Sequence, residues 1–433
     1  MHAAYDVAVI GGGIAGLVAA IDAAKADRSV VLLEKSNRAG GRAASVRRGG
    51  ALFNLGAHAL YRSGEAFAVF REYGLVLNGG TPPQNGIAIW QQRLYPLPGN
   101  AVSLMTSPLL SVAGKMELAK LFMKLPKLNV NALGTLTVRQ WVERNIRDEG
   151  VRRFFYALCR TTTYSVDVDR QLAGPAFTMV QRGLHTGGGV LYLDGGWQSI
   201  VEQLTDLAVL LGVDVRTGNG AAAVEHENGA VRRVRCADGS AIDVSQAVIA
   251  ASPGVACKLV PGSADTALAR WQRQARPSAV ASLDLALRKL PVDGRDAALG
   301  MDRPLYFSNH SRVANLSDDG SVVVHLMKYH APGESDPAAD EQLLERTMSL
   351  LHPGWQKEVV ARQYLPNIVV AHDSMHSGRT DMTPGPAVPE IRGLYVAGDW
   401  ASHGESLVDA AAASGRRAAQ RLVADASLLP SFR

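Results

Sequence analysis

Three glycines near the beginning of the chain have the spacing that phosphate binding requires. Gly11, Gly13 and Gly16 form a G-x-G-x-x-G pattern between the apolar run 7–10 and the alanine-rich stretch 17–26. In a strand–turn–helix unit the first glycine permits the tight turn and the second lets the backbone approach a pyrophosphate. The third lets the helix pack closely on the strand. We predict that the helix N-terminus, with Ala15 in its first turn, directs its free N–H groups at a dinucleotide.

An acidic residue follows at the position where such a site binds a ribose. The apolar run 29–33 reads as a second buried strand and ends at Glu34, roughly 20 residues after the glycines. A carboxylate there accepts hydrogen bonds from a ribose diol and repels a 2′-phosphate. The alternative is a glycine-rich turn with an ordinary surface glutamate beside it.

A further glycine pair and an arginine extend this motif. Lys35 follows the acid, and Gly40-Gly41-Arg42 comes a few residues later. This stretch resembles the FAD-binding fold of the flavin amine oxidase, protoporphyrinogen oxidase and phytoene desaturase superfamily. The resemblance implies that Gly40, Gly41 and Arg42 lie along the cofactor diphosphate, which suits glycine backbone and a guanidinium. A surface turn is the alternative interpretation.

The other end of the chain carries a second part of the resemblance. The run 393–400 reads as a buried strand that ends in Gly398-Asp399, and 406–409 begins a helix that extends to about residue 423. In the resembling family the terminal acid binds the flavin ribitol, a role that falls on Asp399. The helix N-terminus, here Leu407 and Val408, points at the flavin pyrimidine and would stabilise an anionic reduced flavin. Trp400 either lies at the flavin or belongs to the core.

The middle of the chain completes the predicted fold. A Gly-Gly turn at 195–196 precedes a helix, strands at 213–216, 221–225 and 231–236, and a strand at 247–250. The resemblance implies that Ala223 and Val224 lie near the adenine. We therefore predict an α/β protein with a Rossmann-type FAD-binding domain (three-layer ββα) from residues 1–60, 190–255 and 390–433. Residues 61–189 and 256–389 would form a mixed-sheet and helical substrate domain.

The same resemblance implies that both ends of the chain bind one and the same FAD molecule. The glycines at 187–189 and 195–196 lack a strand–turn–helix context, so a separate NAD(P)H domain is not expected. The predicted cofactor residues are Gly11, Gly13, Ala15, Gly16, Glu34, Lys35, Gly40, Gly41, Arg42, Ala223, Val224, Gly398, Asp399, Leu407 and Val408.

Candidate chemistry beyond the flavin is sparse. Relatives carry a glycine-rich turn beside the isoalloxazine, which matches 54–58 here, so His58 is a candidate contact of substrate or flavin; a packed core histidine is the alternative. Many amine oxidases of the family place a lysine on a substrate-domain strand that corresponds to about 278–284. That stretch contains no lysine. This absence favours desaturase- or dehydroxylase-like members over amine oxidases.

Composition excludes several other classes. The chain has 433 residues, with 47% apolar and 20% charged residues, which is typical of a folded protein of about two or three domains. A net charge of +5 is slight for a nucleic-acid binder, and three scattered cysteines form neither a disulfide framework nor a zinc site. His372 and His376 lie in a Gly- and Pro-containing stretch, so we predict no metal. Without a targeting segment we expect a cytoplasmic protein.

One stretch suggests a contact outside the active site. The uncharged run 94–114 is broken by prolines, so it is not expected to span a bilayer. In the following segment, 115–127, apolar residues recur at helical spacing opposite Lys120, Lys124 and Lys127. An ordinary amphipathic helix explains this pattern, and peripheral membrane contact is the second hypothesis.

These observations favour an FAD-dependent oxidoreductase. The expected reaction is hydride removal from a small apolar organic substrate, with oxygen or a quinone-like electron acceptor. The alternatives are a flavin amine or amino-acid oxidase, an isomerase that uses reduced flavin, and a lipid-binding protein on the same fold without redox activity. The retained Gly16, Glu34, Arg42 and Asp399 argue against the last of these.

Overall fold

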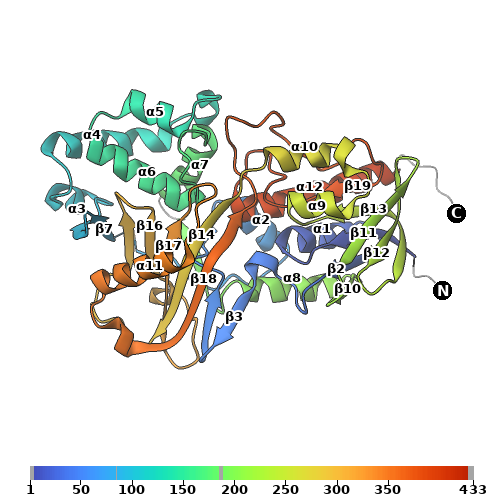
Figure 1. Cartoon of the computed structure of the whole chain (residues 1–433), viewed down its shortest axis with the longest axis horizontal. Helices are drawn as coiled ribbons and strands as arrows, with labels where there is room; N and C mark the ends of the chain where they lie inside the picture. Colours follow the sequence, from blue (N-terminus) through green and yellow to red (C-terminus); the bar gives the residue numbers. More distant parts are fainter. Residues whose placement is uncertain (1–3, 84, 185–188, 428–433) are drawn as a thin grey trace.

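The computed structural model describes residues 4–83, 85–184 and 189–427. Two lobes lie side by side, one built on a mainly parallel sheet and the other on a mixed sheet beneath a layer of helices (Figure 1). Gly187 and Gly188, considered above as a second glycine motif, fall outside the described residues. The first three and the last six residues of the chain, which belong to the predicted FAD-binding domain, also fall outside them.

The sheet of the first lobe has the strand order β10-β2-β1-β13-β12-β11, and β19 pairs with β13. Strands β10, β2, β1, β13 and β19 run parallel, while β12 and β11 return as an antiparallel hairpin. Their bounds are β1 (Ala4–Ile10), β2 (Val30–Glu34), β10 (Asp214–Thr217), β11 (Ala221–Glu227), β12 (Ala230–Cys236), β13 (Ala241–Ile249) and β19 (Leu394–Val396).

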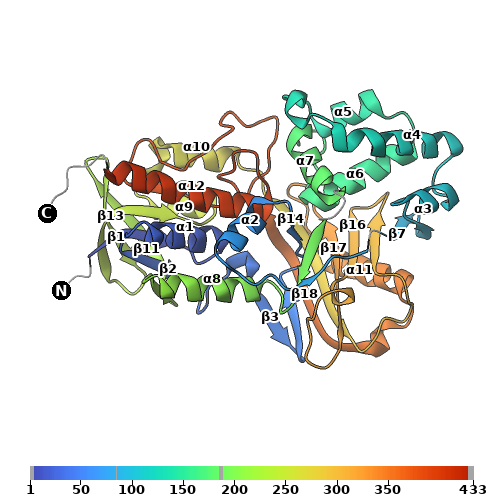
Figure 2. The same cartoon turned by 180° about the vertical axis from the view of Figure 1, so that it is seen from behind.

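Alternating burial explains the layers around this sheet. Val7 and Val9 pack toward one face, while Ala8 and Ile10 pack toward the other, and all four are buried. Because a central parallel strand is buried on both faces, its sequence is a continuous apolar run. One face is covered by α1 (Ile14–Lys25), α2 (Glu65–Glu72), α8 (Gln198–Leu210) and α12 (Leu407–Ser427), and the other by the hairpin with α9 (Pro253–Leu259) and α10 (Ala267–Gln274) (Figures 1 and 2).

Strand β13 is the point at which the C-terminal segment joins the sheet. Residues 241–243 of β13 pair with β12, and residues 247–249 pair with β19. The sheet therefore branches, and β19 carries the following residues to the same edge as the end of β1. This arrangement confirms the predicted α/β fold class.

The second lobe has a mixed sheet of order β18-β14-β17-β16-β15-β7-β8. All neighbouring pairs are antiparallel except β15 and β7. Helix α11 (Pro337–Leu351) covers one face through Leu344, Met348 and Leu351. The strands are β7 (Ile87–Trp90), β8 (Arg93–Pro96), β14 (Ser278–Leu287), β15 (Ala297–Gly300), β16 (Leu305–Asn309), β17 (Val322–Tyr329) and β18 (Val359–Ala371).

A layer of helices with its own apolar core lies over the mixed sheet (Figure 1). It contains α3 (Ala101–Thr106), α4 (Val112–Lys124), α5 (Val138–Asn145), α6 (Glu149–Thr163) and α7 (Ala173–Leu184). The uncharged run 94–114 is divided among β8, α3 and the start of α4. No helix in the described ranges combines the length and the apolar character needed to cross a membrane.

Two small sheets connect the lobes. One is the hairpin β3 (Ser45–Arg48) and β4 (Ala51–Asn54), and the other has the order β5 (Leu60–Tyr61), β9 (Val190–Leu193) and β6 (Gly79–Gly80). Because β4 runs directly into residues 55–58, these connections hold the turn at Gly56 against the mixed sheet.

Candidate cofactor and substrate site

The glycines between β1 and α1 form an open cradle. A Cβ at Gly16 would lie 1.9 Å from the carbonyl oxygen of Gly11, so only glycine permits this approach of helix to strand. A Cβ at Gly13 would meet nothing nearer than 3.9 Å, which leaves the middle of the turn free. The N–H groups of Ile14, Ala15 and Gly16 have no acceptor among the described residues, as expected for a first helical turn. A phosphate fits this arrangement of donors.

Glu34 lies at the end of β2, behind the cradle. Its Oε2 accepts a hydrogen bond from the Gly12 N–H at 2.7 Å, and its Oε1 accepts one from the Ser36 N–H at 2.8 Å. The side chain is 7% exposed. These bonds fix the carboxylate beside the glycine turn, and the second lone pair of each oxygen remains available for a diol.

The predicted adenine contacts lie on the next part of this edge. A Cβ at Gly220 would touch Lys35, so the start of β11 lies against the residue after Glu34. Ala223 is half-buried on β11, whereas the Val224 side chain is fully buried in the core between the hairpin and α9. Lys35 is exposed. Val224 is therefore inaccessible in this structure, and its contact with the adenine remains a prediction.

The second glycine pair closes the other side of the cradle. The Gly40 N–H donates to the Gly12 carbonyl at 2.8 Å, and Gly13 and Gly40 form an isolated bridge. Gly41 lies close to the Cα of Gly13. The two glycine motifs therefore form one continuous backbone surface.

Arg42, whose side chain is 35% exposed, forms a contact with the buried Asp399 of the C-terminal segment. Its two terminal nitrogens donate to the two carboxylate oxygens of Asp399 at 2.6 and 3.0 Å, and one of them also donates to the Val370 carbonyl at 2.7 Å. His372 donates its backbone N–H to Asp399 at 2.7 Å, and its Nδ1 lies 3.0 Å from the same carboxylate. Three segments that are distant in sequence therefore meet at Asp399.

The electrostatics of Asp399 follow from these partners. The carboxylate is 1% exposed. Burial alone would raise the pKa of Asp399, but the Arg42 charge and the bonds from His372 and Arg42 lower it well below its ordinary value. Asp399 is therefore an ionised acceptor at the end of β19. Arg42 is held by this carboxylate, so a role of Arg42 at the diphosphate remains a prediction.

The start of α12 borders a pocket. Gly398, at φ +144°, donates its N–H to Ser414 Oγ, which ties the end of β19 to α12. Leu407 has φ +57°, which is rare for a branched side chain. Leu407 lines the pocket, and Val408 packs against the helical layer of the first lobe. Asp409 does not cap its own helix: its Oδ1 accepts from the N–H of Ala66 in α2, and its Oδ2 accepts from Arg182 in α7.

His58 is a packed histidine with both ring nitrogens near carbonyl oxygens. Nδ1 lies 3.0 Å from the Gly56 oxygen and Nε2 lies 3.2 Å from the Arg42 oxygen. Its ring is 5.5 Å from that of Trp197, and burial lowers the pKa of His58. A neutral ring donates to only one of these carbonyls. His58 therefore supports the turn next to Arg42, and a direct catalytic role remains a prediction.

A buried polar network on the mixed sheet faces the same turn. A Cβ at Gly56 would lie 3.5 Å from Ser282 Oγ on β14. Ser282 donates to Asp284 at 2.7 Å, and His325 Nδ1 on β17 lies 2.8 Å from the same carboxylate oxygen. Gln363 on β18 donates to the other oxygen at 3.1 Å. Ser282, Asp284 and His325 are fully buried, and β14 contains no lysine.

The surroundings of this turn are apolar and aromatic. Ala57 packs in a cluster with Val280, Met327 and Tyr329, against which Tyr164, Val166, Tyr306, Ile368 and Val370 also pack. The Tyr164 hydroxyl donates to the Ala57 carbonyl at 2.7 Å. The side of the Gly56 turn that faces the mixed sheet is therefore packed mainly by apolar and aromatic side chains.

The remaining candidates are structural. His376 Nε2 lies 3.0 Å from the Gln274 oxygen, while His372 binds Asp399, so the two histidines have different partners. Within the described ranges, no group of three or more His, Cys, Asp or Glu side chains is placed to hold a metal ion. Trp400 is 2% exposed, donates to the Ala251 carbonyl and belongs to the core.

The fold is an α/β architecture with a glycine-rich turn between β1 and α1, and comparisons with known proteins give the family. Residues 14–423 match the family model described as flavin containing amine oxidoreductase. The chain therefore belongs to this family and is a flavin-dependent oxidoreductase.

Individual relatives agree with this assignment. The chain is 26% identical over 211 residues to the chloroplastic protoporphyrinogen oxidase of Nicotiana tabacum, a match that covers 46% of this chain and 36% of that protein. An oxidoreductase from Methanosarcina mazei has a similar fold, with a TM-score of 0.78 and 20% identity over 96% of this chain and 100% of the other. The cyclohexylamine oxidase of Brevibacterium oxydans has a TM-score of 0.72 and 16% identity over 98% and 100% of the two chains.

Several residues at the site were not identified from the sequence. His372 was considered only as a metal ligand, and Ser282, Asp284, His325 and Arg379 were not singled out. No local motif marks them, because each gains its position from strand pairing in the mixed sheet or from the loop after β18. A polar residue inside an apolar strand, such as Asp284 in β14, is the one signal that could have indicated a buried network.

Proposed function

We propose that the protein is an FAD-dependent oxidoreductase that removes a hydride from a small apolar organic substrate and passes the electrons to oxygen or a quinone-like acceptor. The bound flavin would supply the hydride-accepting chemistry. The residues of the first lobe fit the dinucleotide: the open backbone at Gly13, the fixed carboxylate of Glu34, and the buried Asp399 that faces both Arg42 and His372. The discontinuous domain division predicted from the sequence is part of this proposal.

The observation that carries the substrate class is the environment of the Gly56 turn. Ser282 is the residue of β14 nearest this turn, and beyond the buried network that Ser282 forms with Asp284 the neighbouring side chains are mainly apolar or aromatic. No lysine lies on β14, and Lys328 on the adjacent strand β17 is bound to Glu334 and Asp340. The chain thus supplies apolar packing and exclusion of water rather than a cationic side chain at this place.

The test is anaerobic reduction of the bound flavin. Purified holoenzyme is mixed with a panel of polyene and polyprenyl compounds and with a panel of amines, and the oxidised flavin absorption band is followed. Bleaching by an apolar compound alone supports the proposal. Bleaching by amines alone overturns the substrate class, and a chain without flavin affinity overturns the function.

An amine or amino-acid oxidase is the second candidate. The family description and the cyclohexylamine oxidase fold favour it. The same flavin assay distinguishes the two, since only this candidate predicts bleaching by the amine panel. Two further classes make different predictions: a non-redox isomerase would convert substrate only after prior reduction, and a lipid-binding protein would not retain flavin.

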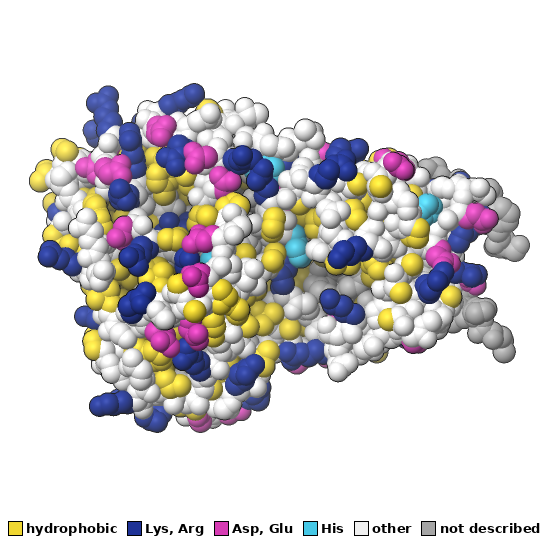
Figure 3. Space-filling view, in the orientation of Figure 1, with side chains coloured by type: hydrophobic (Ala, Val, Ile, Leu, Met, Phe, Trp, Pro, Cys, Tyr) yellow, Lys and Arg dark blue, Asp and Glu magenta, His cyan; other side chains and the backbone are white. Residues whose placement is uncertain are grey.

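We also propose a peripheral contact with anionic membranes through α3 and α4. Leu118 and Leu121 of α4 are buried, which accounts for the predicted apolar face. A second apolar set remains exposed beside Lys115, Lys120 and Lys124, and Figure 3 shows apolar and basic side chains mixed at this end of the molecule. The exposed apolar residues are Val102, Met105, Val112, Met116 and Met123.

Co-sedimentation with vesicles tests this contact. We expect binding to phosphatidylglycerol vesicles that weakens with salt, because basic side chains attract an anionic surface. The variant M105S/M116S/M123S should lose binding, whereas V209S/L210S, which changes exposed apolar residues of α8, should not. Equal binding by both variants would contradict the assignment.

A further inference from the structure

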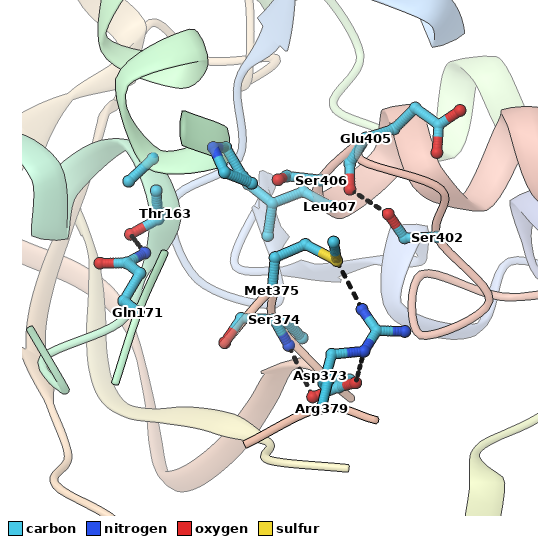
Figure 4. A pocket seen from close by; sticks show the side chains of 13 residues that line it. Thr163, Gln171, Asp373, Ser374, Met375, Arg379, Ser402, Glu405, Ser406 and Leu407 are labelled. Atoms are coloured by element: carbon cyan, nitrogen blue, oxygen red, sulfur yellow. Dashed lines mark hydrogen bonds and ion pairs between the residues drawn. The ribbon is translucent and has the colours of Figure 1, made fainter. Parts of the chain in front are cut away.

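A pocket lies between the two lobes at the start of α12. It is small: the empty volume of about 430 Å³ includes open solvent at its mouth, and a water-sized sphere can enter only about 20 Å³ of it. It is bordered by α6, α7, the loop after β18 and the loop before α12 (Figure 4). Pro175, Ala176, Ala371 and Leu407 give it apolar walls, and polar residues lie at one side. It adjoins the Asp399 cluster, because Ala371 and Asp373 flank His372.

Arg379 lines this pocket and has too few hydrogen-bond partners to account for its burial. Its side chain is 1% exposed, and its Nε and Nη2 have no hydrogen-bond acceptor among the described residues. Its nearest carboxylate oxygen, on Asp373, lies 3.5 Å from Nε, which is too long for a strong hydrogen bond. A buried guanidinium with so few partners is costly, so its retention at a pocket wall points to a ligand.

The remaining nitrogen of Arg379, Nη1, contacts the sulfur of Met375, a weak acceptor that a ligand could replace. Nη1 lies 2.6 Å from the sulfur of Met375, and Figure 4 shows the Met375 side chain between Leu407 and the guanidinium. A thioether is a weak acceptor. Methionine is flexible and tolerates a change of rotamer, so a stronger acceptor entering the pocket can displace it from Arg379.

Neither carboxylate near the pocket fully compensates Arg379. Asp373 Oδ1 accepts from the N–H groups of Arg276 and Ser374 at 2.9 Å, and burial raises the pKa of Asp373 to about 6. Glu405 is paired with Arg417 at 2.6 Å.

We infer that this pocket binds the carboxylate group of an otherwise apolar substrate, with Arg379 as the partner of that carboxylate. Two adjacent N–H groups of one guanidinium match the two oxygens of a carboxylate. A phosphate dianion would bring more charge than a single arginine beside Asp373 can balance. The inference rests on the proposed function, since it adds a carboxylate to the apolar substrate class proposed above.

The experiment compares two ligands of the same shape on the holoenzyme. Binding of 4-phenylbutyrate and of 4-phenylbutyramide is measured by calorimetry at neutral pH. We expect the carboxylate to bind at least tenfold more tightly than the amide. In R379M this ratio should fall to about one, and in R379K it should be intermediate, because lysine retains the charge but not the planar pair of donors.

Two further variants separate a specific contact from general effects. Arg276 contributes its backbone to Asp373 but does not line the pocket, so R276M is the matched control and should keep the wild-type ratio. M375A should raise carboxylate affinity, and it keeps the inference testable if R379M does not fold. Binding of neither ligand, equal binding of both, or an unchanged ratio in R379M would overturn the inference.

Failure of this inference is distinguishable from failure of the proposed function. Flavin content and flavin reduction are measured on the same preparations. A protein that binds and reduces flavin but shows no carboxylate preference refutes only the role of Arg379, whereas a protein without flavin affinity refutes the function itself.

Discussion

At the scale of single residues, Asp399 has the largest number of roles in the site. Its carboxylate is 1% exposed and accepts hydrogen bonds from both Arg42 and His372. Removing one charge of a buried pair leaves the other without compensation. Substitution of Asp399 is therefore the most sensitive test of the proposed cofactor site.

We expect D399N to weaken flavin binding by at least tenfold, because Arg42 and His372 lose the anion that positions them. Flavin affinity is measured by titrating deflavinated protein and following flavin fluorescence. D169N is the matched control, since Asp169 forms an exposed pair with Arg139 and does not contact Arg42, His372 or Asp399. Equal affinities in D399N and D169N would contradict a cofactor role for Asp399.

Asp409 provides a prediction about pH. Burial raises the pKa of Asp409 to about 6, while the Ala66 N–H and Arg182 act in the opposite direction. Between its unfolded pKa and about pH 6 the native state therefore holds more protons than the unfolded state, and stability falls as pH rises. A shift of this size is worth about 3 kcal/mol.

In D409N this contribution is absent. We expect the variant to show a flatter dependence on pH between about 4 and 6, because asparagine does not ionise and therefore avoids the loss of stability that accompanies ionisation of Asp409. Urea unfolding at several pH values measures this dependence. A slope equal to that of the wild type would show that Asp409 does not titrate in this range.

At the scale of elements, we expect two glycines of the turn between β1 and α1 to have different roles, one in folding and the other in binding. A Cβ at Gly16 would collide with the Gly11 carbonyl, so G16A should destabilise the lobe or prevent folding. A Cβ at Gly13 would meet no close atom, and its φ of −78° suits alanine. We expect G13A to fold with nearly wild-type stability and to lose flavin affinity, because its methyl group fills the cradle.

Thermal unfolding of the flavin-free proteins and flavin titration distinguish the two effects. Loss of stability in G13A would show that this position is structural, and unchanged flavin affinity in G13A would place the phosphates elsewhere.

The same elements show what could be predicted from the sequence. The spacing of Gly11–Gly16 and Glu34 indicates that they face one ligand, and the family resemblance adds Gly40–Arg42 to the same surface. The strand before Asp399 was also recognisable, because an apolar run followed by Gly-Asp and a helix is a local pattern, although β19 ends at Val396 and not at Asp399. In contrast, Ser282, Asp284 and His325 meet only through the pairing of β14 with β17, and Arg379 reaches the pocket through an irregular loop. No local pattern encodes such contacts.

At the scale of the whole molecule, the ion pairs connect segments that the chain separates widely. Arg42 of the first lobe contacts Val370 at the end of β18 and Asp399 after β19, and Arg182 of α7 contacts Asp409 of α12. A ligand bound at Asp399 would therefore stabilise the contact between lobes as well as the nucleotide cradle. Binding at one hundred times the dissociation constant contributes about 2.7 kcal/mol to the native state.

We expect this stabilisation to be unevenly distributed. On flavin removal, amide hydrogen exchange should increase at 11–16, 40–42, 370–372 and 398–409, because their backbone surrounds the proposed site. Exchange in α3 and α4 should remain unchanged, since their core is separate and belongs to the helical layer. Hydrogen exchange read by mass spectrometry on holo and flavin-free protein measures this difference. A uniform increase over the chain would instead mean that the flavin stabilises the fold as a single cooperative unit, and no increase at 370–372 would separate the second lobe from cofactor binding.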